Sequence, residues 1–100
     1  MKFYGTMICS DTVYADKVLR RNGIDIEYID ITASTANLKE FLALRDSKDE
    51  FVSIKETGKI GVPAFLLDNG SITFDVYDIE GVTEHIEEEG DTKPGMCDIL

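Results

Sequence analysis

Along the chain, the spacing of hydrophobic residues switches between the two-residue period of strands and the roughly 3.6-residue period of helices. The first segment, Lys2–Met7, is short and aromatic-rich and is followed by polar residues, which predicts a strand. Over Thr12–Asn22 apolar residues recur at helical spacing, and Ser10 and Asp11 are suitable N-cap residues. Asn22 followed by glycine is a C-terminal stop signal. The chain therefore opens with a strand and a helix.

A second strand and a second helical region follow. Residues 24–31 alternate, with apolar side chains partly on both faces, and predict a strand. Ser34 or Thr35 begins the next helix. Its expected apolar stripe consists of Leu38, Phe41, Leu42 and Arg45. A break is expected at residues 46–48, after which a shorter helix ends near Gly58.

The last part of the chain predicts two more strands. Gly61–Leu67 is predicted to be a buried strand, which the chain enters through Pro63. Asp68–Gly70 is a hairpin turn signal, and Ile72–Phe74 is the fourth strand. A last helix is expected somewhere within Asp75–Glu89, using Ile79, Val82 and Ile86. This pattern predicts an antiparallel pair of strands followed by a helix.

The order of these elements predicts the fold class. A strand-helix-strand start implies a parallel pair joined by a right-handed crossover, and the tight turn implies an antiparallel pair. The chain is therefore expected to be an α/β protein with a mixed four-stranded sheet flanked by helices. We expect one domain over residues 1–89 and a C-terminal tail over residues 90–100.

Composition narrows the classes of function. The chain has 100 residues, 43% of them hydrophobic, enough for one packed domain. With 20 acidic and 10 basic residues its net charge is −10, which argues against nucleic acid and anionic membranes as partners. No stretch has the length of a membrane span and the N-terminus lacks a signal peptide's apolar region, so we expect a cytoplasmic protein, monomeric by default. His85 and two distant cysteines form no ligand cluster, so no metal site is expected.

The candidate chemistry lies at Cys9, between the first strand and the first helix. Unpaired backbone N–H groups at a helix start favour an anion, and a thiolate there has a lowered pKa. The alternative is an inert, half-buried cysteine that acts as a small apolar residue. The second cysteine, Cys97, is either a distant resolving thiol for Cys9 or an incidental thiol on the tail.

Two motifs on this topology carry a resemblance to a known family. The segment Tyr4–Thr12, followed by a helix and then by Gly61-Val62-Pro63, resembles the glutaredoxins, most of all the small bacterial glutaredoxin-related proteins. The resemblance covers about Lys2–Ile79 and implies a thioredoxin-like fold of the glutaredoxin type. Cys9 matches the reactive thiol, and Thr12 stands where the family has its second cysteine, which gives a one-thiol Cys-x-x-Thr motif.

The resemblance also implies a mechanism and a site. A one-thiol site would act by thiolate attack and mixed-disulfide exchange, with glutathione as possible co-substrate or a protein disulfide as partner, and with no tightly bound cofactor. Thr12 could donate a hydrogen bond to the Cys9 sulfur. Val62 and Pro63 match the family's docking edge, with the Val62–Pro63 peptide bond cis. Ser10, Asp11 and Asp75 complete the expected substrate-binding set.

The sequence departs from the family pattern at several positions. Thr6 replaces a lysine of many glutaredoxins, Ser10 replaces the usual proline, and a carboxylate at Asp11 should raise the pKa of the thiol. Thr73-Phe74 stand where the family has two glycines that let glutathione approach. Lys55 and Lys59 either hold a carboxylate of the ligand or are solvated lysines.

Three functions are consistent with these residues. The first is thiol–disulfide exchange at Cys9. The second is a redox-inactive binding module that docks a peptide or thiol at the Val62–Pro63 edge. The third is iron–sulfur cluster carriage through glutathione, which one-thiol glutaredoxins perform as dimers. The third ranks last because it depends on glutathione binding.

Overall fold

A computed structural model describes residues 1–84 of the chain. Its strands are β1 (Lys2–Gly5), β2 (Glu27–Asp30), β3 (Ala64–Leu66) and β4 (Ile72–Thr73). Its α-helices are α1 (Ser10–Arg21), α2 (Thr35–Ser47) and α3 (Val52–Glu56), and its 3₁₀ helices are η1 (Asp49–Phe51) and η2 (Val76–Asp78). The predicted domain end at residue 89, the tail, His85 and Cys97 lie outside the described residues.

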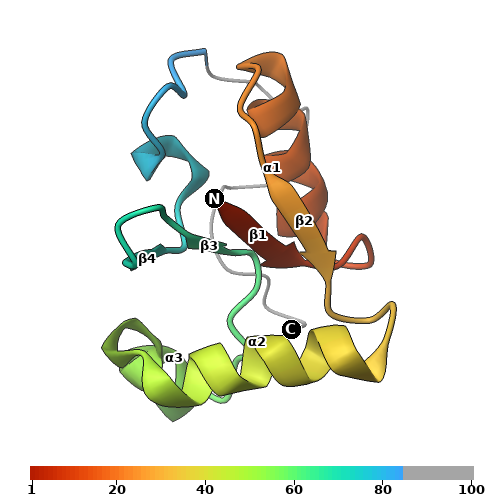
Figure 1. The fold of residues 1–100 in the computed structure, drawn as a ribbon, viewed down its shortest axis with the longest axis vertical. Coiled ribbons are helices and arrows are strands. Elements are labelled where there is room, and N and C mark those ends of the chain that lie inside the picture. Colours follow the sequence, from red (N-terminus) through yellow and green to blue (C-terminus); the bar gives the residue numbers. More distant parts are fainter. Residues whose placement is uncertain (85–100) are drawn as a thin grey trace.

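The strands form one mixed sheet in the order β2-β1-β3-β4 (Figure 1). β1 pairs in parallel with β2, with Phe3 opposite Tyr28. β1 and β3 pair antiparallel, with Phe3 opposite Phe65, and β3 and β4 are also antiparallel. The predicted α/β class, the mixed four-stranded sheet and the flanking helices are therefore confirmed.

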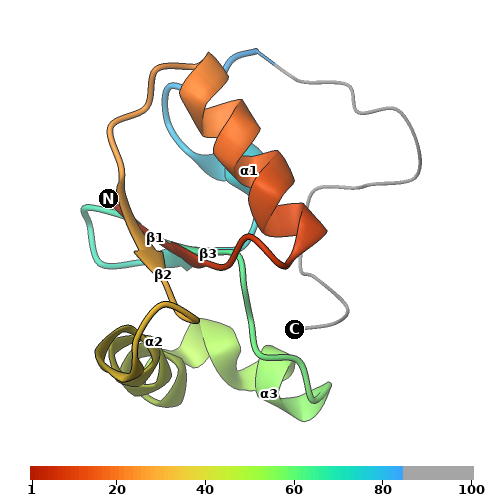
Figure 2. The same ribbon diagram turned by 90° about the vertical axis from the view of Figure 1, so that its right-hand side faces the viewer.

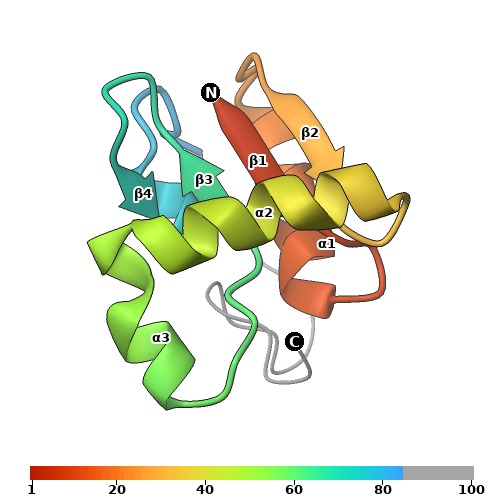
Figure 3. The same cartoon turned by 60° about the horizontal axis from the view of Figure 1, so that its bottom comes forward.

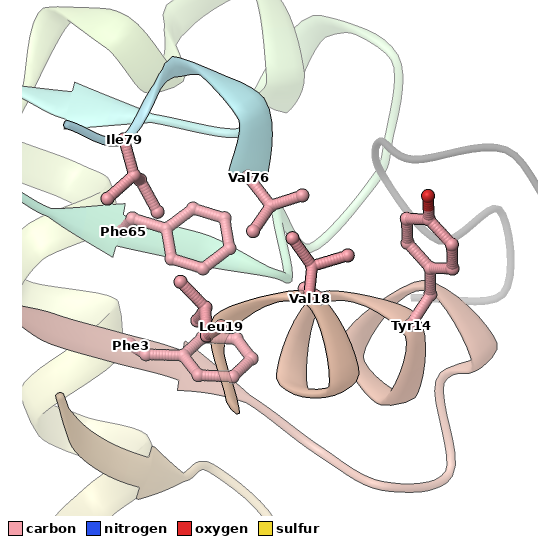
Figure 4. Packing of buried hydrophobic residues seen from close by; sticks show 8 residues of the cluster. Phe3, Tyr14, Val18, Leu19, Phe65, Val76 and Ile79 are labelled. Atoms are coloured by element: carbon pink, nitrogen blue, oxygen red, sulfur yellow. The ribbon is translucent and has the colours of Figure 1, made fainter. Parts of the chain in front are cut away.

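Helix α1 covers one face of this sheet, while α2 and α3 cover the other (Figure 2). On the α1 face, Phe3 and Phe65 stack with ring centroids 4.9 Å apart. Figure 4 shows Val18 and Leu19 of α1 pointing at these rings from one side, and residues of the η2 region from the other. The buried members of this cluster are Phe3, Tyr14, Ala15, Val18, Leu19, Phe65, Val76 and Ile79.

The other face of the sheet is covered by α2, which crosses it as Figure 3 shows, and by η1. Phe41 of α2 and Phe51 of η1 meet edge to face at 5.8 Å. The predicted α2 stripe is only partly right, because Leu38 and Leu42 are 38% and 37% exposed. Helix α2 presents Phe41 and the half-buried Leu44 to the core instead. The apolar residues of α2 thus extend around the helix beyond the side that packs on the sheet, and Leu38 and Leu42 lie outside that contact.

The predicted last helix is wrong within the described residues. Only one turn of 3₁₀ helix, η2, forms there, and residues 79–84 are irregular. Gly81 has φ +94°, a left-handed conformation that α-helices do not contain. The Asp75 side chain accepts a hydrogen bond from the Tyr77 N–H at 2.9 Å and so caps η2. Ile79 is buried as the predicted helix required, although its backbone is not helical.

Two tyrosine hydroxyls on adjacent strands lie in opposite environments. The Tyr4 hydroxyl donates to Glu40 Oε2 at 2.7 Å, and Lys2 Nζ donates to the same oxygen at 3.3 Å. The hydrogen bond from Tyr4 lowers the pKa of Glu40, while burial and then Glu40 raise the pKa of Tyr4. The Tyr28 hydroxyl is buried with no hydrogen-bond partner in the described structure, and burial raises the pKa of Tyr28 to about 12.

We expect Tyr4→Phe to lower the free energy of unfolding by about 1–2 kcal/mol, because it removes a charge-assisted hydrogen bond. Tyr28→Phe is the matched control and should leave stability unchanged or raise it, because it removes a buried unpaired hydroxyl. Urea unfolding of the two variants measures the difference. Equal losses in both would contradict the assigned hydrogen bonding.

Candidate thiol site

Cys9 is the N-cap residue of α1. Its backbone is extended, at φ −97° and ψ 120°, and its carbonyl accepts the Val13 N–H at 3.1 Å. The expectation that Ser10 or Asp11 caps this helix is therefore wrong, because helical hydrogen bonding begins one residue earlier. The Cys9 side chain makes no capping hydrogen bond. The first N–H groups of α1 are thus not capped by the side chain of the N-cap residue itself.

A tight turn carries the chain from β1 to Cys9. The Cys9 N–H donates to the Thr6 carbonyl at 3.0 Å, which closes the turn. Thr6 is 1% exposed, and its hydroxyl lies 2.9 Å from that of Thr32. Thr6 therefore packs into the core. It supplies no positive charge near Cys9, unlike the lysine that many glutaredoxins carry at this position. Ser10 is exposed and Asp11 half-buried in the first turn of α1.

Thr12 packs directly on β1. It is fully buried, and a Cβ built on Gly5 would lie 2.6 Å from Thr12 Cγ2. Its hydroxyl has no hydrogen-bond partner in the described structure, so the expected hydrogen bond to the Cys9 sulfur is not formed there. Thr12 is three residues after Cys9, which places both on the same face of the helix start. The site therefore contains a buried hydroxyl with unused hydrogen-bonding capacity.

Val62 and Pro63 directly precede β3. Both are buried, and the Val62–Pro63 peptide bond is cis, as expected. Tyr4 pairs with Ala64, so extending this antiparallel register by one residue sets Pro63 beside Gly5. Gly5 in turn lies against Thr12. Two motifs about fifty residues apart in sequence are therefore both placed beside Gly5, at the carboxyl end of β1.

One positioning residue was missed from the sequence. The Arg45 guanidinium donates to the carbonyls of Lys59 and Ile60, each at 2.8 Å, and so holds the loop that leads into Val62. Arg45 was assigned to the apolar stripe of α2, where its charge was the only signal of a different role. Of the two candidate lysines, Lys55 is exposed at the end of α3 and Lys59 is half-buried in the loop that follows.

The thiol lies beneath the surface of the molecule. Cys9 has 0% of its surface exposed, whereas Met7 and Ile8, in the turn before it, are 44% and 71% exposed. Thiolate attack by Cys9, as inferred from the sequence, needs an exposed sulfur at the helix start. The structure does not show one. A reagent therefore reaches Cys9 only after local opening of the structure.

Asp75 belongs to a different feature. It lines an open groove of about 440 Å³ beside β4, which contains none of the other predicted site residues. The lining residues are Glu50, Ser53, Ile54, Ile72, Thr73, Phe74, Asp75 and Asp78. Within it Thr73 Oγ1 donates to Asp78 Oδ2 at 2.9 Å. Cys9, Ser10, Asp11 and Thr12 thus lie together at the start of α1, Val62 and Pro63 lie just before β3, and Asp75 lies in this separate groove.

Within residues 1–84 no group of three or more His, Cys, Asp or Glu side chains is placed to bind a metal ion. No helix of the same part of the chain has the length and apolar character needed to cross a membrane.

The fold and the site define an α/β protein with a buried cysteine at the start of the helix that follows its first strand. Over 68 residues the chain is 43% identical to an uncharacterized protein of Haemophilus influenzae, a match that covers 68% of this chain and 79% of that protein. The chain belongs to the same family as this uncharacterized protein. No family model matches the chain, and no solved structure matches it significantly.

Proposed function

We propose that the protein is a thiol–disulfide oxidoreductase of the one-thiol type, with Cys9 as its nucleophile. The observation that carries the proposal is the position of Cys9 at the N-terminus of α1, three residues before Thr12, which packs against Gly5 at the end of β1. Backbone N–H groups at such a helix end favour a thiolate over a thiol. The proposal includes a thioredoxin-like fold of the glutaredoxin type, which the sheet order β2-β1-β3-β4 supports.

The proposed reaction exchanges one disulfide for another. The Cys9 thiolate attacks one sulfur of a substrate disulfide, whose S–S bond breaks as a new bond to Cys9 forms. The other half of the substrate leaves as a thiolate. A second thiol then attacks the Cys9 sulfur, releases the rest of the substrate as another thiolate and becomes disulfide-bonded to Cys9 itself. A third thiol attacks the sulfur of that second thiol, forms a disulfide with it and releases the Cys9 thiolate, so that two electrons pass from these two thiols to the substrate.

The groove beside β4 favours a protein disulfide over glutathione as partner. The side chains of Thr73 and Phe74 occupy the positions where glutaredoxins have glycine, and both line the groove. Three carboxylates, those of Glu50, Asp75 and Asp78, line it as well. These negative charges oppose an anionic tripeptide such as glutathione.

The burial of Cys9 favours a second candidate function, the redox-inactive binding module. Because Cys9 has no exposed surface, its sulfur can react with a disulfide or a thiol only after local opening of the structure. In this alternative the Val62–Pro63 edge would still dock a partner, and Cys9 would serve only as a packed residue.

Alkylation of Cys9 across pH distinguishes the two candidates. The Cys97→Ser variant leaves Cys9 as the one thiol, and iodoacetamide modification is followed by mass spectrometry. We expect modification of the folded protein with a midpoint below about 8.5, the pKa of an ordinary cysteine, because thiolate is the reacting form. A midpoint at or above that value, or reaction only after denaturation, would support the binding module instead.

A further inference from the structure

We propose that a groove at the start of β1 docks a basic segment of a partner protein, in which apolar side chains lie between lysines or arginines. This β1-start groove consists of two adjoining hollows of about 450 and about 520 Å³, whose walls share Met1, Asp25, Leu67 and Asp68. Figure 3 shows the start of β1, marked N, between the connection from α1 to β2 and the turn from β3 to β4. The two volumes fall within the range of about 300–1,000 Å³ that ligand pockets have.

The floor of the β1-start groove is apolar, in part because residues alternate just before β2. Ile24 and Ile26 are half-buried, whereas Asp25 and Glu27 are exposed. Both isoleucines pack against the buried cluster on the α1 side of the sheet. The half-buried apolar residues that line the groove are Met1, Ile24, Ile26, Leu66 and Leu67. A partner that covers them gains the free energy of burying apolar surface.

The rim of the β1-start groove is acidic. Five exposed carboxylates line it, those of Asp25, Glu27, Asp68, Asp78 and Glu80. Asp68 pairs with the Met1 amine at 3.0 Å, and within residues 1–84 the other four form no ion pair. Lys2, the one lysine or arginine among the described residues of the groove, pairs with Glu40 instead, at 3.3 Å. The groove therefore has a surplus of negative charge.

Charge complementarity identifies the kind of partner. Carboxylates around an apolar floor attract a segment whose cationic side chains reach the rim while its apolar side chains enter the groove. The same carboxylates repel nucleic acid and anionic membranes. They also repel a second copy of this chain, which would bring an identical acidic rim against them. A basic segment of another protein is the occupant that satisfies both the floor and the rim.

The β1-start groove is separate from the thiol site. Cys9 is the N-cap of α1, while Ile24 lies two residues beyond the C-cap of this helix, Asn22. The 12 residues of α1 span about 18 Å, so the groove and Cys9 lie at opposite ends of the helix. Docking in the groove is therefore independent of any redox role of Cys9.

Two fluorescein-labelled peptides of equal length test the docking, one in which lysine alternates with leucine and one in which lysine alternates with serine. Fluorescence anisotropy measures their affinity for the folded full chain, and amide chemical shifts in NMR spectra locate the bound peptide. The lysine–leucine peptide should bind about tenfold more tightly or better, because only its side chains cover the apolar floor. Its addition should shift the amides of residues 24–27 and 66–68.

Two triple variants with the same net charge separate docking from general attraction to an acidic protein. Asp25→Asn, Glu27→Gln and Glu80→Gln together remove three rim charges and should weaken the lysine–leucine peptide about tenfold, since three exposed charge pairs are lost. The control combines Asp46→Asn, Asp49→Asn and Glu56→Gln, all exposed and none of them in the groove. It should bind the peptide as the wild type does.

Several results would overturn the proposal. Equal weakening in both triple variants would show general attraction between opposite charges, and equal affinity of the two peptides would show that the apolar floor is not used. Shifts confined to the surroundings of Cys9, or no binding, would remove the groove as a docking site. Shifts of the groove amides as the protein alone is concentrated would assign the groove to a second copy. None of these results bears on the reactivity of Cys9.

Discussion

Replacing Cys9 with serine is expected to reduce disulfide exchange to the rate measured without protein. A serine hydroxyl is not ionised near neutral pH and forms no disulfide, so neither step of the exchange has a nucleophile. The assay follows reduction of a model protein disulfide with a dithiol as electron donor. Serine and cysteine are similar in size, so the fold should persist, which circular dichroism checks. Exchange at the wild-type rate in Cys9→Ser would remove the enzyme proposal.

The companion variant Thr12→Cys asks whether the site is otherwise competent. A thiol at this position lies three residues after Cys9 on the same helix start, where it can resolve a mixed disulfide locally. We therefore expect faster exchange than in the wild type. A Thr12→Cys protein that gains nothing, although it folds, would indicate a docking site without redox activity.

The order and topology of the elements could be predicted from the sequence because they depend on local patterns. The strand pattern of Lys2–Met7, the helical periodicity of Thr12–Asn22 and the turn at Asp68–Gly70 each act over a few residues. These patterns and the right-handed crossover rule leave few possible sheets. The cis Val62–Pro63 peptide bond was expected from the family resemblance and is observed.

Features set by long-range packing could not be predicted. The full burial of Cys9 is set by tertiary packing, and the apolar residues Met7 and Ile8 just before it are exposed, an order that no local pattern predicts. The extent of the last helix depended on Gly81, whose positive φ no apolar periodicity reports. The role of Arg45 depends on carbonyls fifteen residues away. Each is a tertiary effect that overrides a local preference.

The contact between Gly5 and Thr12 yields the other large expected effect, this time on stability. A methyl group added at Gly5 would lie 2.6 Å from Thr12 Cγ2 and 2.9 Å from Oγ1. Thr12 is β-branched, buried and held in α1, so its side chain has little freedom to move aside. We expect Gly5→Ala to lower the free energy of unfolding by about 3 kcal/mol, the upper part of the range for overpacked cores. Urea unfolding measures this loss.

A double-mutant cycle assigns that loss to the contact itself. Thr12→Ala removes both crowding atoms and leaves only the Cβ, 3.3 Å from the added methyl group. In the Thr12→Ala background Gly5→Ala should therefore cost about 1 kcal/mol or less, a coupling of about 2 kcal/mol. Additive losses would place the strain in the backbone of β1 rather than against α1. They would also contradict the packing that brings the start of α1, and Cys9 with it, onto the strand end beside Pro63.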